Sequence, residues 1–524
     1  MSALILLAAM PAAAEGEFAA KVAALNAKNF SEKETAVKAL AEIAEPQAPV
    51  ILQALLEGRL YYKEGGAIVI VADAAEGYAL TDAVSGADMG SVPIADVKRI
   101  NLNNSLRTLL REVLAMLDLV DPDAAVRMGA INELIGNLKP ESAELLRQRL
   151  SAEPDADVRA RMEIALALND LASADRRRVM DSLAVLQGSL DPEVRAAIGG
   201  LAENHEDAGV RAEAVKALKA IEGRIQLYGF IETVFFGLSL GSILVLIAIG
   251  LAITFGVMGV INMAHGELMM LGAYTTYAVQ QIFPNHIELS LLLAVPAAFL
   301  VSAAAGIAIE RGVIRFLYGR PLETLLATFG TSLILQQLVR TLVSAQNVAV
   351  ITPQWMSGSW QINSVLSLTY NRLYVFIFAM LVFAVLVLLL KRTALGLEVR
   401  AVAQNRAMAK AVGIRTGWVD AMTFGLGSGI AGVAGVALSQ LTNVGPNLGQ
   451  GYIIDSFMVV VFGGVGNLWG TLVGGISLGI ANKFLEPMAG AVIAKILVLI
   501  FIILFIQKRP RGLFPQKGRA AESH

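Results

Sequence analysis

The chain has 524 residues, of which 56% are hydrophobic, and its mean hydropathy of +0.62 is typical of a membrane protein rather than a soluble enzyme. It contains no cysteine, which excludes disulfides, and its basic residues form short clusters beside apolar spans, which argues against a nucleic-acid-binding surface. The charge is uneven: residues 1–224 hold 24 Lys and Arg against 34 Asp and Glu, and residues 225–524 hold 18 against 10. We therefore expect two parts that face different solvents, joined near Arg224.

The first fourteen residues resemble a secretory signal peptide. A short apolar core is followed by the small residues Ala12, Ala13 and Ala14, although the usual basic start is missing. Cleavage after Ala14 would place the following part outside the cytoplasm. A buried first helix of that part is the alternative.

Residues 15–224 are predicted to form a helical domain with a small β insert. Apolar residues recur at helical spacing over residues 18–56, and two short strands are expected at 67–73 and 77–84. From Ser105 onward a phrase recurs in which an acidic or Pro-containing turn precedes a Val-Arg pair and an Ala-rich helix. The pairs are Val126-Arg127, Val158-Arg159, Val194-Arg195 and Val210-Arg211. This pattern favours HEAT-like helical hairpins that bind other proteins; an all-helical domain without a true repeat is the alternative.

The next stretch predicts two membrane crossings that meet at a polar break. No Lys or Arg occurs from Ile225 to Glu310, and the apolar run is interrupted by Asn262, His265 and Glu267. Cytoplasmic loops normally carry basic residues, so we expect this break to lie at membrane depth, where protein or water lines it. Its three polar residues are candidates for a solute pathway. A short neutral cytoplasmic loop is the alternative.

Basic residues predict the orientation of the remaining spans. Three clusters, within 311–320, 391–415 and 508–519, follow apolar spans and are placed inside, and the loops without basic residues are placed outside. The result is an all-α membrane domain over 225–516 with about eight spans including broken helices, and a cytoplasmic tail at 517–524. It also places residue 225 outside, as a signal peptide would. Arg340, near the outer end of its span, is the exception.

A second broken hairpin is expected over residues 452–484. Gly466, Gly470 and Gly474 lie four residues apart, a spacing that lets helices approach closely, and Asn467 at the turn is a further pathway candidate. For each polar residue at the two breaks, hydrogen bonding between helices is the competing role. We expect no metal site and no cofactor.

The basic loop from Lys391 to Gly417 predicts an amphipathic helix that ends at a glycine. Exposed to the cytosol, such a helix suits docking into a groove of another protein, and attraction to anionic lipid is the alternative. Its proposed docking residues are Gly396, Arg400, Ala401, Asn405, Ala409 and Gly413.

Four sequence motifs together resemble the permease subunits of branched-chain amino-acid ABC importers, over residues 228–516. They are the phrase at 241–274, the loop that starts at Gly396, the hairpin at 462–480 and the RPRGLFP ending at 509–515. The long N-terminal part and the wording INMAHGELMMLGAYTTYAV are similar to the urea branch of that family.

The resemblance implies a multi-pass protein of the bacterial inner membrane that imports urea. Its partners would be a second permease subunit, two cytoplasmic ATPase subunits and an extracytoplasmic solute-binding protein, with the 396–414 segment coupled to an ATPase. The general Glu-Ala-Ala…Gly signature of such coupling loops is absent. The chain has no G-x4-GK[ST] loop, so ATP would be hydrolysed by the partners. The alternatives are a branched-chain amino-acid or short-chain amide permease, a secondary transporter, and a membrane-anchored scaffold.

Overall fold

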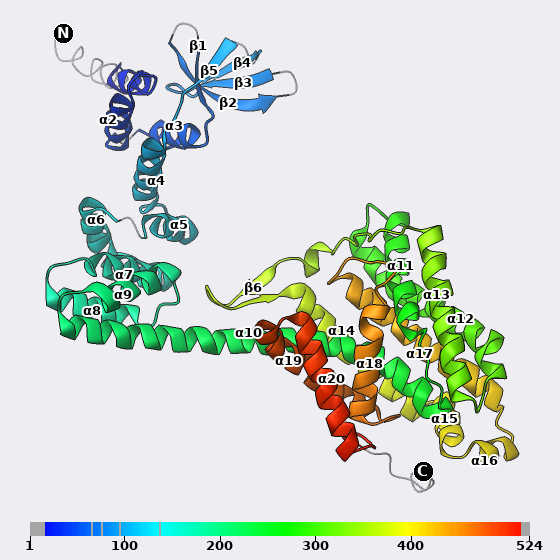
Figure 1. Cartoon of the computed structure of the whole chain (residues 1–524). Helices are drawn as coiled ribbons and strands as arrows, with labels where there is room; N and C mark the ends of the chain where they lie inside the picture. Colours follow the sequence, from blue (N-terminus) through cyan, green and yellow to red (C-terminus); the bar gives the residue numbers. More distant parts are fainter. Residues whose placement is uncertain are drawn as a thin grey trace, which may run out of the picture. The chain divides into compact units, whose positions relative to one another are not determined.

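The computed structural model describes residues 16–514, except 44, 64–65, 75–76, 94–95 and 136–137. Two compact units make up the chain, residues 1–224 and residues 225–524 (Figure 1). The predicted signal peptide and the predicted tail at 517–524 lie outside the described residues.

The N-terminal unit begins with short helices and an antiparallel sheet. Helices α2 (Phe30–Ala41) and α3 (Gln47–Leu56) precede β1 (Leu60–Lys63), β2 (Ile68–Ala74), β3 (Gly77–Asp82), β4 (Asp88–Val92) and β5 (Val97–Arg99), and the sheet has the order β4-β3-β2-β1-β5. The register pairs Val71 with Leu80, and both side chains are buried. The two predicted strands are thus present as β2 and β3. The other three have five residues or fewer, too few to show the alternation that marks a strand, and β4 and β5 also contain Asp, Gly or charged residues.

Helical hairpins follow the sheet. They comprise α4 (Asn104–Asp118), α5 (Ala124–Leu134), α6 (Pro140–Leu150), α7 (Ala156–Asp170), α8 (Arg176–Leu186), α9 (Pro192–Asn204) and the start of α10 (Ala208–Met258). Aspartates begin several of them: Asp123, Asp155 and Asp175 each accept a hydrogen bond from a backbone N–H of the first turn.

The arginines of three of the four Val-Arg pairs brace the turns between these helices. Arg127 Nη1 donates to the carbonyl oxygens of Asp121 (2.8 Å) and Pro122 (3.0 Å), and Arg159 Nη2 donates to that of Glu153 (2.6 Å). Arg211 Nη1 reaches the carbonyl oxygens of His205 and Glu206 in the same way. In each case the arginine satisfies carbonyls five or six residues earlier, so the repeated phrase stabilises a repeated turn.

The C-terminal unit is almost entirely helical. After α10 come α11 (His265–Ile282), α12 (Ile287–Gly312), α13 (Pro321–Leu342), α14 (Tyr370–Arg392), α15 (Ala394–Gln404), α16 (Arg406–Ala411), α17 (Thr416–Ser439), α18 (Gln450–Gly463), α19 (Leu468–Ala489) and α20 (Ala491–Lys508). Seven helices in the described part are long and apolar enough to cross a membrane. This confirms the predicted polytopic helical class. A small hairpin of β6 (Ser359–Gln361) and β7 (Ser367–Thr369) joins α13 to α14 and was not predicted.

Both predicted helix interruptions are present. Helix α10 ends at Met258, Gly259 adopts a positive φ of 66°, and α11 begins at His265. Helix α18 ends at Gly463, and α19 begins at Leu468 after Gly464 and Gly466, which also have positive φ. The short lengths of α11 and α18 follow from these interruptions.

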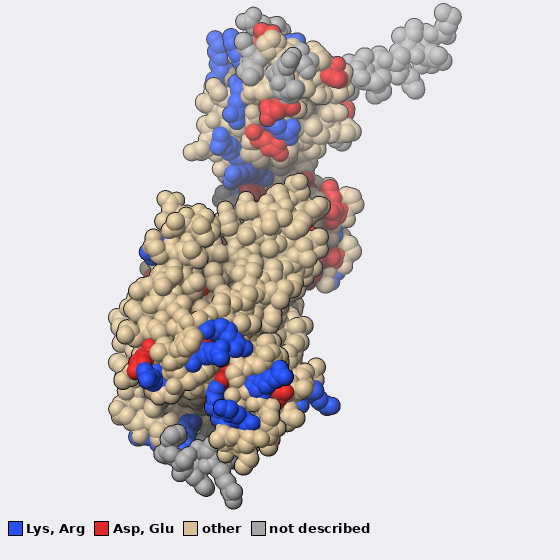
Figure 2. Space-filling view, turned by 90° about the vertical axis from the view of Figure 1, so that its right-hand side faces the viewer, with Lys and Arg blue, Asp and Glu red and all other residues tan. Residues whose placement is uncertain are grey.

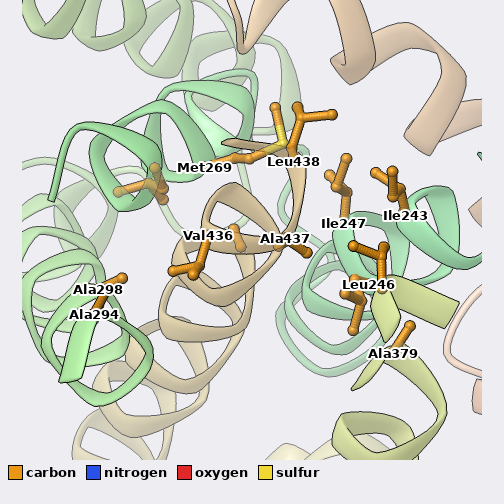
Figure 3. Packing of buried hydrophobic residues seen from close by; sticks show 14 of the residues in the cluster. Ile243, Leu246, Ile247, Met269, Ala294, Ala298, Ala379, Val436, Ala437 and Leu438 are labelled. Carbon is orange, nitrogen blue, oxygen red and sulfur yellow. The ribbon is translucent and has the colours of Figure 1, made fainter. Parts of the chain in front are cut away.

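Small residues dominate the packing around α17. Its buried residues are mainly Gly, Ala, Ser and Val, and it packs against α11 and α12. A Cβ atom on Gly427 would lie 2.7 Å from the Gly250 carbonyl oxygen of α10, so only glycine permits this approach. Figure 3 shows Val436, Ala437 and Leu438 of α17 among aliphatic side chains of α10, α11, α12 and α14.

Candidate functional site at the first helix break

Glu267 is held in the interior by two side chains of α13. Its side chain lies in the first turn of α11 and is 1% exposed. Its Oε1 accepts hydrogen bonds from Ser332 Oγ (3.1 Å) and Gln336 Nε2 (2.7 Å). Its Oε2 has no hydrogen-bond partner among the residues that the structure describes. A buried carboxylate oxygen without a donor is costly, so this atom is available to accept a hydrogen bond from an N–H or O–H donor.

Ser332 and Gln336 belong to a polar stripe on α13 that sequence reasoning missed. Its members are four residues apart and all buried: Thr324, Thr328, Ser332 and Gln336. Thr328 Oγ1 also accepts a hydrogen bond from the backbone N–H of Met263 (3.1 Å), so the stripe holds the break itself. The opposite face exposes large apolar side chains such as Leu322 and Leu326. The four-residue spacing of polar residues in an apolar helix was the available signal.

Asn262 and His265 shape the break. Asn262 Oδ1 accepts a hydrogen bond from the Ala264 N–H (3.0 Å), and His265 Nε2 lies 2.9 Å from the Ile247 carbonyl oxygen of α10. Because a carbonyl only accepts, Nε2 carries the proton and Nδ1 is the acceptor of the ring. Asn262 Nδ2 and His265 Nδ1 are buried and have no hydrogen-bond partner within the described part of the chain. The three predicted residues therefore surround one helix junction, and each has one atom engaged and another available.

Asn467 has a structural position at the second break. Its Oδ1 accepts hydrogen bonds from the N–H groups of Trp469 and Gly470 at the start of α19, and its Nδ2 donates to the Phe514 carbonyl oxygen (3.2 Å). A helix cap accounts for the two contacts of Oδ1, and the Nδ2 contact joins the break to the segment after α20. The two breaks adjoin, because a Cβ on Gly256, in the last turn of α10, would lie 2.5 Å from the Gly466 Cα atom.

The three glycines of the second break have different surroundings. Gly470 of α19 meets the backbone of Gly463 so closely that a Cβ on either would clash with the other. Gly474 is next to the same helix, and its Cβ would lie 3.1 Å from the Val459 carbonyl oxygen. Gly466 lies in the turn with φ of 76°. Gly470 and Gly474 thus lie where α18 and α19 pack, while Gly466 provides the turn.

Arg340 follows Gln336 by four residues, one helical turn beyond the end of the stripe. Its side chain is exposed, and Nη2 donates to Asn447 Oδ1 (2.7 Å). The hydrogen-bond partner of Arg340, which the sequence did not identify, is therefore the side-chain amide of Asn447 in the loop after α17.

The predicted amphipathic helix is two helices, α15 and α16. Asn405 between them has an extended backbone (φ −155°), and its side chain accepts a hydrogen bond from the Met408 N–H (2.9 Å). The cap ends one helix and starts the next, because Asn side chains compete for backbone donors. Gly396 packs on the Leu390 backbone, to whose carbonyl Arg400 donates. Gly413, with φ of 93°, follows α16.

The pair α15–α16 has an apolar inner side and an outer side that combines apolar and basic residues. Ala409 is buried with Val399, Val402 and Val419, and the partly buried Ala401 packs against them. Met408 and Val412 are 60% and 69% exposed, and Arg400 and Lys410 of the same two helices are exposed as well. This outer side has the composition of a docking surface.

Comparison with known proteins decides the family. The family model described as the permease component of branched-chain amino acid transport systems matches residues 233–506. The chain belongs to this family.

Curated relatives agree with this assignment. The branched-chain amino acid permease BraD of Pseudomonas aeruginosa is 31% identical over 297 residues, which cover 55% of this chain and 96% of BraD. LivH of Escherichia coli K12 is 30% identical over 298 residues, with the same shares. No solved structure matches this permease significantly. The N-terminal unit precedes the part that the family model matches.

Proposed function

We propose that this chain is the permease subunit of an ATP-driven importer for a small neutral amide, with urea as the solute. The observation that carries the proposal is the buried cluster of Glu267, Ser332 and Gln336 beside the first helix break. Ionisable groups inside a set of apolar helices are expensive and mark functional positions, substrate pathways among them.

The chemistry of the break suits a planar molecule that has two NH₂ groups and one carbonyl. Glu267 Oε2 can accept an N–H, Asn262 Nδ2 can donate to a carbonyl, and His265 Nδ1 can accept a second N–H. All three atoms are buried and lack partners among the described residues, so a solute would replace missing hydrogen bonds rather than existing ones.

A branched-chain amino acid is the second candidate solute, because BraD and LivH are named for it. Arg340 favours it as well, since an amino acid needs a cation for its carboxylate and an anion for its ammonium group. Glu267, through its bond to Gln336, and Arg340 both lie toward the C-terminal end of α13. Against this candidate, Arg340 is exposed and already bonded to Asn447.

The proposed assembly follows the family. A second permease subunit, two cytoplasmic ATPases and an extracytoplasmic solute-binding protein complete the importer in the bacterial inner membrane. The N-terminal unit lies outside the cytoplasm, and the C-terminus and α15–α16 lie inside. The exposed Met408 and Val412, flanked by basic residues, support ATPase docking at α16.

Reconstitution of the complete complex in vesicles tests the function. Labelled urea and labelled leucine are offered with and without ATP and the binding protein. We expect ATP-dependent urea uptake that exceeds leucine uptake. Leucine preference would reject urea and select the second candidate. Uptake that ignores ATP would indicate a secondary transporter, and absence of any uptake would indicate a scaffold.

A matched pair of variants tests the site. Gln336→Leu removes a buried partner of Glu267, whereas Gln337→Leu makes the same change one residue later on the exposed face of α13. We expect uptake to fall about tenfold or more for Gln336→Leu, because Glu267 Oε1 loses a donor. Gln337→Leu should transport like the unmodified chain. Equal uptake by both variants would remove the cluster from the pathway.

A further inference from the structure

We propose that Arg406, Asp420, Tyr318 and Glu310 form a latch that passes motion from α16 to the helices around the first break. The inference rests on the proposed function, because it assumes that α16 docks on an ATPase. It assigns a positioning role to four residues outside the break.

Two carboxylates lie fully buried at the ends of different helices. Glu310, near the end of α12, and Asp420, near the start of α17, are both 0% exposed. Buried carboxylates are retained only when they are paired and hydrogen-bonded. Tyr318 Oη donates to Glu310 Oε1 (2.8 Å), and Arg311 Nε lies 3.5 Å from Glu310 Oε2.

Arg406 connects α16 to both carboxylate sites. It is the first residue of α16, its Nη2 pairs with Asp420 Oδ2, and its guanidinium lies over the Tyr318 ring, 4.9 Å from the centroid. Its side chain is 42% exposed, so the pair lies at the boundary between the helix bundle and solvent. One arginine therefore holds α16 to α17 directly and, through Tyr318, to α12.

Close packing leads from the latch to the break. Helix α17 packs on α12 so tightly that a Cβ on Gly432 would clash with Ser302 Oγ and the Ala298 carbonyl oxygen. Ser302 Oγ in turn donates to the Leu268 carbonyl oxygen of α11 (2.9 Å). Leu268 is the residue after Glu267. A displacement of α16 is thus carried by rigid, glycine-packed helices to the residue that the proposed pathway uses.

The pair of Arg406 and Asp420 also has a purely structural explanation, in which Arg406 only neutralises the buried charge of Asp420. A latch and a structural pair differ in the ratio of solute moved to ATP hydrolysed. Loss of a structural pair lowers uptake and ATPase activity together, because less folded complex is present. Loss of a latch leaves the ATPases active and lowers uptake alone.

The test uses the complete reconstituted complex with whichever of urea and leucine the unmodified protein imports. We expect Arg406→Gln and Asp420→Asn each to lower uptake per ATP hydrolysed by between about two- and thirtyfold, the range of typical coupling effects. Tyr318→Phe, which keeps the ring and loses the bond to Glu310, should lie between these variants and the unmodified chain. Arg315→Gln removes an exposed charge from the segment between α12 and α13, outside the docking surface, and should leave the ratio unchanged.

A double variant that exchanges the two charges distinguishes loss of the ion pair from a folding defect. Arg406→Asp combined with Asp420→Arg restores an opposite-charge pair and should recover part of the ratio lost in the single variants. Uptake per ATP equal to that of the unmodified chain in both Arg406→Gln and Asp420→Asn would overturn the latch. So would a parallel fall of uptake and ATPase activity without recovery in the exchange. Failure of the proposed function is distinct, because the unmodified chain itself would then show no ATP-dependent uptake.

Discussion

The two units of this protein differ in where their large aliphatic side chains lie. In the N-terminal unit the fully buried residues include Leu25, Leu40, Ile51 and Leu106. In the permease unit large aliphatic residues lie outside, as Leu326 of α13 does with 72% exposure, while α17 buries mainly small residues. The face of the permease unit seen in Figure 2 is broadly free of charge, with Lys and Arg gathered at one end. The surrounding medium explains the difference. Water favours burial of leucine, whereas lipid tails are as apolar as leucine, so burial in the permease unit gains no hydrophobic free energy.

Charged pairs show the same contrast. In the N-terminal unit Arg127 and Glu153 form a two-pronged buried pair (2.7 and 3.0 Å), and Arg127 also braces the preceding turn. In the permease unit Arg406 and Asp420 join two helices at the solvent boundary. The first pair connects α5 to the turn before α7 with both side chains buried, and the second connects a partly exposed arginine of α16 to a buried carboxylate of α17.

The largest expected effect is on the aliphatic core of the N-terminal unit. Leu106→Ala should lower the free energy of unfolding of that unit by about 2–5 kcal/mol, because it leaves a cavity. Leu326→Ala on α13, at a side chain that is mostly exposed, should change stability by less than about 0.5 kcal/mol. Hydrogen exchange of the full chain, read on peptides of each unit, measures both. Similar losses would contradict the contrast between the units.

A glycine change tests the small-residue packing of the permease unit. In Gly427→Val the new side chain would meet the Gly250 carbonyl oxygen and Thr254 Cγ2, at a cost of about 1–3 kcal/mol in stability and a marked loss of uptake. Gly330→Val is the control, because a Cβ there has no neighbour within 4 Å. Thermal unfolding in detergent compares the two. Tolerance of Gly427→Val would show that α10 and α17 can separate without loss.

Acid should weaken the N-terminal unit through Glu153. Hydrogen bonds from Arg127 hold the pKa of the Glu153 carboxyl below its usual value. A lowered folded-state pKa means that this stabilisation is complete above the unfolded value of 4.5 and is lost as pH falls through the folded value. Glu153→Gln should therefore reduce the acid sensitivity of exchange in α5–α7, whereas the exposed Glu163→Gln should not. Identical pH profiles for both variants would contradict the assignment.

The smallest effect is expected at an exposed pair. Lys216 Nζ and Glu213 Oε1 lie 3.0 Å apart, three residues along α10, with the lysine side chain 71% exposed. Lys216→Ala should change the stability of the N-terminal unit by less than about 0.5 kcal/mol, because water and salt screen such pairs. The same exchange measurement on α10 checks this. A loss as large as that of Leu106→Ala would mean that the pair is not solvated.

Features that depend on local sequence were predictable. The apolar runs located the membrane helices, the polar phrase at Asn262 to Glu267 and the glycines at 463–466 located the interruptions, and alternation located β2 and β3. Contacts between distant segments were not predictable. Glu267 accepts hydrogen bonds from Ser332 and Gln336, which lie 65 and 69 residues later in the chain, and no spacing rule predicts contacts over such separations.

The sequence by itself determined which segments favour lipid, where helices stop and which turns repeat, because hydropathy, glycine torsions and capping act within a few residues. Only the tertiary structure decided which polar faces meet. The stripe on α13 could have faced any neighbour, and Arg406 could have pointed to solvent, as the exposed Lys410 does. Packing settles these choices, because a buried polar group is tolerated only where the whole bundle brings it a partner.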